Sequence, residues 1–296
     1  MAIPTILITG ANGQLGREFR ELAQAWPTFN FLFAGKEGLS VEDASAVRRY
    51  FETNPINFCI NCAAYTAVDK AETEAEFAYR INAEAVGNLA SVCKIHEAVF
   101  IHISTDYVFD GTADQPYKED HPVSPVNLYG ASKLKGEELA IQNNPGTIII
   151  RTSWVYSSFG NNFVKTMLRL MGERESINVV SDQQGCPTYA ADLADAIMQI
   201  VSQHLDSEIT RPLKAPHIYH YSNTGITNWY EFACAIKDLS GKNCLVKPIQ
   251  TADYPTPAKR PAYSVLETFK IQQAFNITIP FWKESLEKCI PLLENK

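Results

Sequence analysis

The stretch Pro4–Phe19 reads PTILITGANGQLGREF and contains the feature that decides the fold. An apolar, strand-like run ends at Gly10, and a helical pattern begins at Gln14, with Gly13 and Gly16 beside its start. Glycines let the backbone turn sharply and approach a phosphate, and a helix N-terminus favours negative charge. The stretch therefore predicts a turn that binds the pyrophosphate of a nicotinamide dinucleotide. The sequence contains no GxxxxGK(S/T) motif, which argues against a P-loop nucleotide triphosphatase.

Short apolar runs alternate with longer helical patterns after this turn. Near-continuous apolar runs fit strands that are buried on both faces of a parallel sheet. Strands that alternate with helices through short links are typical of right-handed βαβ units. We therefore predict an α/β fold with a doubly wound parallel sheet of the Rossmann type. Its expected strands are 4–10, 31–35, 57–63, 99–105 and 147–153, and its expected helices are 14–26, 45–52, 74–96 and 129–142.

The second half of the chain is less regular. Helical patterns cover 162–171, 190–204, 229–239 and 283–293, and a strand-like run covers 218–223. The Pro- and Asp-rich loop 110–127 fits no element, and long loops inside compact domains are often functional. We expect a cofactor domain of residues 1–155 and 190–224, and a smaller, discontinuous α/β substrate domain of residues 156–189 and 225–296.

The composition excludes several classes of protein. The chain has 296 residues, of which 46% are hydrophobic, and a net charge of −7, without the basic surface that nucleic-acid binding needs. No apolar stretch approaches the 18 or more residues that a membrane helix requires, and the N-terminus does not resemble a signal peptide. The seven cysteines are scattered, which favours reduced thiols in the cytoplasm.

The end of the fourth expected strand and the helix that follows carry the candidate catalytic residues. Tyr129 and Lys133 are four residues apart, so both side chains lie on one face of a helix. A neighbouring ammonium favours the phenolate and lowers the pKa of a tyrosine from its usual value near 10. Tyr129 could then donate a proton to a carbonyl oxygen while the Thr105 hydroxyl binds the same oxygen.

The end of the second strand bears on the choice of cofactor. Rossmann folds that select NAD place there a carboxylate that binds the ribose 2′-hydroxyl. This strand ends in Ala34-Gly35-Lys36, without an acid at that place. Lys36, together with Arg17, could accept a 2′-phosphate, although both also fit solvated surface cations. We expect NADPH as the cofactor, with NADH as a second possibility.

The chain resembles the extended short-chain dehydrogenase/reductases and, within them, the dTDP-4-dehydrorhamnose reductases. The resemblance runs over almost the whole chain, and seven stretches carry it in order: GANGQLG, NCAAYTAVDKAE, STDYVFDG, YGASKLKGE, RTSWVY, DQQGCPTYAADLA and KRPAYSVL. It implies reduction of dTDP-4-dehydro-β-L-rhamnose to dTDP-β-L-rhamnose, in the biosynthesis of bacterial surface polysaccharides such as lipopolysaccharide. The smaller domain would then bind the dTDP-sugar, which is the expected binding partner. We expect the protein to be a monomer or a homodimer.

The resemblance also implies the site residues. The catalytic residues would be Thr105, Tyr129 and Lys133, with Tyr129 as proton donor. The cofactor would meet Gly10, Asn12, Gly13, Gln14, Leu15, Gly16, Arg17, Lys36, Ala63, Ala64, Tyr65, Tyr129 and Lys133. The sugar nucleotide would meet Thr66, Val68, Thr105, Asp106, Tyr107, Trp154 and Arg260.

Two positions depart from the family pattern. The aspartate that often contacts adenine is replaced by Ser40. Glu18 matches one glutamate of a magnesium site that some members have, but the later position falls on Ala191, with Asp192 next to it. A single glutamate with an uncertain partner makes a weak metal site. We therefore expect activity without magnesium, no metal site, and Glu18 as a solvated carboxylate on the first helix.

Two other functions fit the same motifs. One is another 4-keto-sugar-nucleotide reductase or an epimerase of the same superfamily, which would hold NAD tightly. The other is a non-catalytic NADP-binding subunit that resembles the regulatory β subunit of methionine adenosyltransferase, because such a subunit can retain the three catalytic residues.

Overall fold

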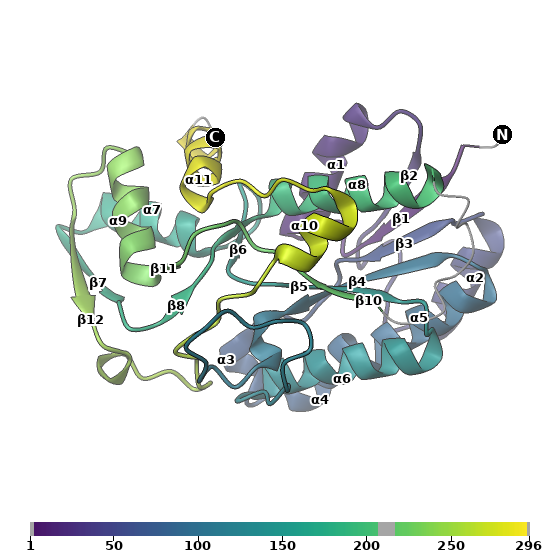
Figure 1. The fold of residues 1–296 in the computed structure, drawn as a ribbon, viewed down its shortest axis with the longest axis horizontal. Coiled ribbons are helices and arrows are strands. Elements are labelled where there is room, and N and C mark those ends of the chain that lie inside the picture. Colours follow the sequence, from purple (N-terminus) through teal and green to yellow (C-terminus); the bar gives the residue numbers. More distant parts are fainter. Residues whose placement is uncertain (1–2, 207–216, 295–296) are drawn as a thin grey trace.

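The computed structural model describes residues 3–206 and 217–294. Its centre is a parallel sheet of six strands in the order β10-β5-β4-β3-β1-β2 (Figure 1). The strands are β1 (Thr5–Thr9), β2 (Asn30–Ala34), β3 (Phe58–Asn61), β4 (Val99–Thr105), β5 (Ile148–Thr152) and β10 (His217–His220). The predicted doubly wound parallel sheet is confirmed.

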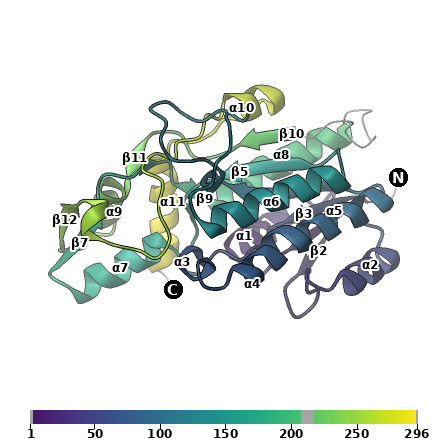
Figure 2. The same ribbon diagram turned by 90° about the horizontal axis from the view of Figure 1, so that it is seen from below.

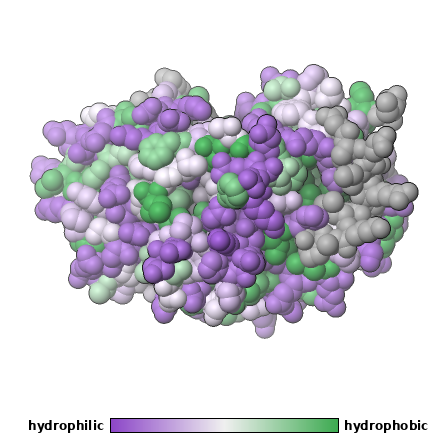
Figure 3. All heavy atoms as spheres, in the orientation of Figure 1, coloured by the Kyte–Doolittle hydropathy of each residue, from purple (hydrophilic) through white to green (hydrophobic). Residues whose placement is uncertain are grey.

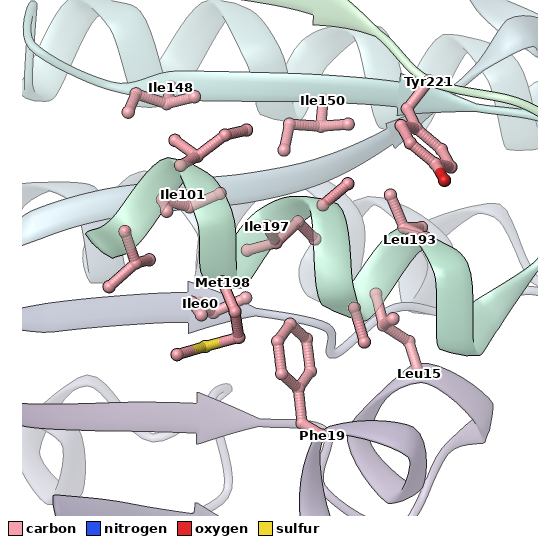
Figure 4. Packing of buried hydrophobic residues seen from close by; sticks show 14 of the residues in the cluster. Leu15, Phe19, Ile60, Ile101, Ile148, Ile150, Leu193, Ile197, Met198 and Tyr221 are labelled. Atoms are coloured by element: carbon pink, nitrogen blue, oxygen red, sulfur yellow. The ribbon is translucent and has the colours of Figure 1, made fainter. Parts of the chain in front are cut away.

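Helices cover both faces of the sheet (Figures 1 and 2). On one face, α1 (Gln14–Leu22) and α8 (Ala190–Asp206) pack against each other and against the strands. Leu15 and Phe19 from α1 meet Leu193 and Ile197 from α8 over the strand isoleucines (Figure 4). The other face is covered by α2 (Ala44–Thr53), α5 (Ala85–Ile95) and α6 (Leu128–Asn143). Burial on both faces explains why the strand sequences are apolar throughout.

The expected helix 74–96 is not continuous. It consists of α4 (Ala75–Tyr79), a π-helical segment (Arg80–Glu84) and α5, and the short helix α3 (Val68–Ala71) precedes it. Asn82 lies in the π-helical segment, and a Cβ on Gly136 of α6 would approach its carbonyl oxygen within 2.0 Å. The glycine thus allows α6 to pack directly on this segment. Single π turns inside helices are often found at functional sites.

A second group of elements packs beside the sheet around a separate apolar cluster. Its helices are α7 (Phe163–Glu173), α9 (Trp229–Leu239) and α11 (Trp282–Glu294). Its parallel strand pair is β7 (Ser176–Val180) with β12 (Leu245–Ile249), neither of which was predicted. The short pairs are β6 (Val155–Tyr156) with β9 (Thr188–Tyr189) and β8 (Gln184–Gly185) with β11 (Thr227–Asn228). The helix α10 (Phe269–Phe275) packs on β10.

The remaining connections and the surface agree with the sequence. Loop 110–127 contains no named helix or strand and touches the second half through a bridge between Tyr117 and Leu266. The seven cysteines are free thiols. On the face shown in Figure 3, hydrophilic residues predominate and apolar residues lie in small groups. Within 3–206 and 217–294, no helix has the length and hydropathy needed to cross a membrane.

Candidate active site

The glycine turn lies between β1 and α1, where the predicted pyrophosphate site should be. Gly10 has a φ of +63°, and a Cβ on it would lie 2.5 Å from the backbone nitrogen of Ala63, so glycine is required here. Gly13 is the N-cap of α1, and no side chain in the described part of the chain caps it. The N–H groups of the first turn are therefore available to an anion, as a pyrophosphate requires.

A cavity of about 260 Å³ opens beside this turn. It is lined by residues that follow three neighbouring strands: Gly10, Asn12 and Gly13 after β1, Gly35, Lys36, Leu39, Ser40, Val41 and Glu42 after β2, and Cys62, Ala63 and Ala64 after β3. The order of the parallel strands reverses between β1 and β3, and such a switch point is where open α/β sheets bind ligands. The cavity and the glycine turn together fit a dinucleotide.

Charged side chains border this cavity at the end of β2. Lys36 is 76% exposed, and its Nζ lies 3.8 Å from Glu42 Oε2. Glu42 Oε1 accepts a hydrogen bond of 2.8 Å from Arg80 Nε. Lys36 thus lies at the end of β2 beside the cavity, where the sequence predicts a contact with a 2′-phosphate. The guanidinium of Arg17 lies over the ring of Phe159 instead, 5.8 Å from its centroid.

Three other expected cofactor residues act through different contacts. Leu15 is buried in the apolar cluster, so only its backbone can face the turn. Gln14 links the turn to the second group of elements, because its Oε1 accepts a hydrogen bond of 2.9 Å from Asn162 Nδ2. Tyr65 donates its hydroxyl to Glu74 Oε2 at 2.7 Å and its backbone N–H to Asn82 Oδ1 at 2.8 Å.

Tyr129 and Lys133 lie on α6, which begins at Leu128 after the N-cap Asn127, whose Oδ1 accepts a hydrogen bond from Gly130 N. Tyr129 is half-buried, and loss of hydration raises its pKa to about 12, although a hydrogen bond with Thr105 lowers it. The prediction that Lys133 lowers this pKa is therefore not met in this structure. A phenol with a raised pKa keeps its proton at neutral pH, although it is a weaker acid than a group whose pKa lies near 7.

Lys133 reaches across to β4 rather than along its own helix. Its Nζ donates a 2.6 Å hydrogen bond to the carbonyl oxygen of Ile103 and lies 3.3 Å from His102 Nε2. The side chain is buried, and burial lowers the pKa of Lys133 to about 8. Glu137 and Cys62 have the opposite, smaller effect and raise this pKa. This lysine thus exchanges its proton closer to neutral pH than an exposed lysine does.

Thr105 and Asp106 end β4 beside Tyr129. Thr105 Oγ1 donates a hydrogen bond of 2.9 Å to Asp106 Oδ1 and accepts one from Tyr107 N at 3.2 Å. Asp106 is buried, and burial raises its pKa to about 7, although hydrogen bonds from Thr105 and Ser264 lower it. The carboxyl next to the threonine therefore changes its charge near neutral pH.

A second, larger cavity of about 600 Å³ has Tyr107, the residue after Asp106, in its wall. Its walls include Asp69, Tyr107, Gln183, Trp229, Tyr254 and Arg260. Arg260 Nη2 donates a 2.8 Å hydrogen bond to Asp69 Oδ2. Its buried Nη1 has no hydrogen-bond partner among the described residues. Two of the predicted substrate residues, Tyr107 and Arg260, thus line the cavity.

The other predicted substrate residues lie near the same wall. Trp154 stacks on Trp229 with the ring centroids 3.5 Å apart and has a φ of +47°, which is rare for a tryptophan. A Cβ on Gly185 would lie 2.6 Å from the Trp154 indole, so the glycine leaves room for this ring. Thr66 is exposed and Val68 half-buried at the start of α3, which Asp69 continues.

The expectation that Glu18 is a solvated carboxylate is wrong. Glu18 is 6% exposed, because α1 packs under the segment after β6. Ser157 Oγ donates a hydrogen bond of 2.5 Å to Glu18 Oε1. Asp192, near the second position of the family's metal site, accepts hydrogen bonds from Ser285 and Asn223. Among the residues that the structure describes, no group of three His, Cys, Asp or Glu side chains is placed to hold a metal ion.

Two residues of this site had little signal in the sequence. His102 contacts Lys133, and its only signal in the sequence was a polar residue inside an apolar strand. Asn82 ties the loop after β3 to α6, because its Nδ2 donates to Tyr65 O and to Ser132 Oγ, both at 3.0 Å. A buried asparagine within a helical pattern gives no local indication of such a role.

Comparisons with known proteins agree over almost the whole length of the chain. A family model described as the RmlD substrate binding domain matches residues 4–294. The dTDP-4-dehydrorhamnose reductase of Aggregatibacter actinomycetemcomitans is 42% identical over 288 residues, 95% of this chain and 97% of that protein. The spore coat polysaccharide biosynthesis protein SpsK of Bacillus subtilis is 42% identical over 284 residues, 96% of this chain and 95% of that protein. A solved dTDP-4-dehydrorhamnose reductase from Bacillus anthracis, in complex with NADP, has a TM-score of 0.91 and 38% identity, covering 98% and 99% of the two chains.

Proposed function

Since the chain belongs to the dTDP-4-dehydrorhamnose reductase family, we propose that it is an NADPH-dependent oxidoreductase that reduces the 4-keto group of dTDP-4-dehydro-β-L-rhamnose to give dTDP-β-L-rhamnose. The observation that carries the proposal is that the candidate catalytic residues adjoin residues that line each of the two cavities. Tyr129 lies edge-on to Tyr107, with ring centroids 5.6 Å apart, and Tyr107 lines the larger cavity. Lys133 interacts electrostatically with Cys62, which lines the cavity beside the glycine turn.

The chain's own residues supply binding, orientation and a proton. The first turn of α1 and the backbone of Ala63 and Ala64 hold the cofactor, which supplies a hydride when bound. Tyr129 donates its hydroxyl proton to the carbonyl oxygen as that oxygen gains negative charge. Its raised pKa keeps the proton in place until the substrate arrives, and the hydrogen bond with Thr105 fixes the direction of the phenol.

The larger cavity has the chemistry to hold a sugar nucleotide. Arginine is well suited to bind a diphosphate, and Arg260 lines this cavity. Asp69 fixes the guanidinium from the side. Aromatic rings at Tyr107, Trp229 and Tyr254 offer flat apolar surface for a base and a sugar. We therefore assign the dTDP-sugar to this cavity, with Trp154 behind Trp229.

The decisive experiment is incubation of the purified protein with synthetic dTDP-4-dehydrorhamnose and NADPH. We expect NADPH oxidation and, by NMR, the dTDP-β-L-rhamnose product. Tyr129→Phe should reduce kcat by roughly a hundredfold to ten-thousandfold, the range for a lost general acid. Tyr230→Phe, at a half-buried position of α9 that lines neither cavity, is the matched control and should retain wild-type turnover. Full turnover in Tyr129→Phe would refute the role of this phenol.

The same experiment separates the alternative functions. A reductase of another 4-keto sugar would turn over a different dTDP- or UDP-sugar faster, and an epimerase would purify with bound NAD. A regulatory subunit would oxidise no NADPH and would instead capture a methionine adenosyltransferase. We also propose that the protein is active in EDTA and that it is a monomer or homodimer. We further propose two domains, one of residues 1–155 and 190–224 and the other of residues 156–189 and 225–296.

A further inference from the structure

A row of buried polar side chains crosses the sheet beneath the catalytic lysine. Thr9 on β1 pairs in register with Asn61 on β3, and Asn61 pairs with His102 on β4. All three are at most 1% exposed. Buried polar side chains in a sheet core are costly unless each is hydrogen-bonded, so the direction of each bond in the row is informative.

The amide of Asn61 has only one orientation that satisfies its neighbours. Its Oδ1 accepts a hydrogen bond of 2.6 Å from Thr9 Oγ1 and one of 3.2 Å from the backbone N–H of Ala63. A backbone N–H only donates, so the atom that faces it is the oxygen. The Nδ2 of Asn61 therefore faces His102 Nδ1, at 3.1 Å.

This orientation fixes the tautomer of His102. An amide nitrogen only donates, so Nδ1 of the imidazole is the acceptor and the ring proton is on Nε2. Burial and the neighbouring Lys133 lower the pKa of His102 well below its usual value, so the ring is neutral. The Nε2–H then points at Lys133 Nζ, 3.3 Å away. An ammonium offers no lone pair to this donor, whereas a neutral amine does.

We propose that His102 is a positioning residue for Lys133. Asn61 sets the proton of His102 on Nε2, and this N–H favours the neutral amine of Lys133 over the ammonium. Because the value of such an amine depends on Tyr129 acting as proton donor, the inference rests on the proposed function. When Tyr129 has given up its proton, water can carry one to it from an ammonium at Lys133, whose Nζ contacts β4, so that an N–H breaks and the phenol O–H forms. The amine that results is the form that His102 stabilises, and water then supplies the next proton.

Other groups around Lys133 act in known directions. Glu137, one turn along α6, and Cys62, after β3, raise the pKa of Lys133, while burial lowers it. Glu137 is itself paired with Arg151 of β5. The contribution of His102 must therefore be measured with these groups left unchanged.

The first test needs no substitution at the site. In protein labelled with ¹⁵N-histidine, we expect NMR to show His102 with Nδ1 unprotonated and Nε2 protonated at pH 7. Its signals are assigned by their loss in His102→Gln. A proton on Nδ1, or on both nitrogens, would overturn the proposal, whether or not the variants below fold.

The second test reverses the tautomer. Asn61→Asp keeps the acceptor for Thr9 and Ala63 but turns the other atom into an acceptor, so His102 should protonate on Nδ1 and present a lone pair to Lys133. The pKa of Lys133, followed by the NMR titration of its ¹⁵Nζ, should rise by at least about one unit, a tenfold gain in proton affinity. Thr9→Val leaves the Ala63 N–H in place and should leave the pKa unchanged. No rise in Asn61→Asp would contradict the proposal.

The added carboxylate also attracts a proton to Lys133 directly, and a double variant separates this effect. Asn61→Asp/His102→Phe carries the same charge without the imidazole, so we expect a smaller rise than in Asn61→Asp alone. An equal rise would show that His102 has no part. These titrations use no substrate, so their failure is distinct from failure of the proposed reaction, which the turnover assay reports. In that assay, the apparent pKa on the alkaline side of the kcat profile should move with Lys133.

Discussion

Glu137→Gln should destabilise the protein more than any other loss of an ion pair described above. Glu137 on α6 and Arg151 on β5 are each 3% exposed, and the guanidinium contacts both carboxylate oxygens, at 2.9 Å and 2.7 Å. Such two-point pairs are the strong ones. In the variant, an amide NH₂ faces the guanidinium donors, and the Arg151 charge is left without a counter-charge in the core.

The expected cost follows from this burial. Removing one partner of a buried pair costs about 3–5 kcal/mol, because the other charge stays buried and uncompensated. In a protein of this size, that corresponds to a fall in Tm of roughly 6–20 °C. The free energy of unfolding is measured by urea denaturation followed by far-UV circular dichroism, at pH 7 and constant salt.

Two further variants make the result interpretable. Glu173→Gln removes a pair with Arg169 that is more than half exposed, and should cost less than about 0.5 kcal/mol. Glu137→Leu/Arg151→Met removes both charges and should be more stable than Glu137→Gln alone. If Glu137→Gln lies within about 1 kcal/mol of the wild type, at the level of an exposed pair, the burial argument is wrong.

Three other predictions concern the site. Lys36→Ala should raise the KM for NADPH about tenfold, as expected for the loss of one hydrogen bond to a charged group, and should leave the KM for NADH unchanged. The control Lys135→Ala, on an exposed face of α6, should change neither KM. Burial raises the pKa of Asp106 from 3.8 to about 7, so the stability contributed by its protonated form is present below pH 4 and is lost as the pH rises to 7. Urea denaturation should show that the wild type loses on the order of 4 kcal/mol of unfolding free energy over this range, relative to Asp106→Asn. Gly185→Ala should displace the Trp154 indole, change the tryptophan fluorescence and raise the KM for the dTDP-sugar about tenfold, or about 1.4 kcal/mol of binding.

The parts of the fold that the sequence predicts are those whose signal is local. The glycine turn lies within a few residues of β1 and α1, so Gly10 and Gly13 were placed correctly between these two elements. Tyr129 and Lys133 share a helix face because of their spacing alone, and β4 has the bounds that its apolar run predicts.

The parts that the sequence did not predict depend on partners far along the chain. Glu18 is buried because it meets Ser157, 139 residues later. Arg260 is aimed by Asp69, 191 residues earlier. β7 and β12 lack the continuous apolar run of the strands in the first sheet, and they pair with each other across 64 or more residues of chain. Periodicity within one segment carries no information on these distant contacts.

The return of late segments to the first sheet has a consequence for synthesis on the ribosome. β10 adds to β5 only after residue 220 has been made, and α8 covers the face that α1 leaves open. Ile277 and Ile279 complete the same apolar cluster. A nascent chain that ends after β5 therefore has an unpaired strand edge and an uncovered apolar face, which are the features that promote aggregation. The N-terminal half should need protection by chaperones until translation is nearly finished.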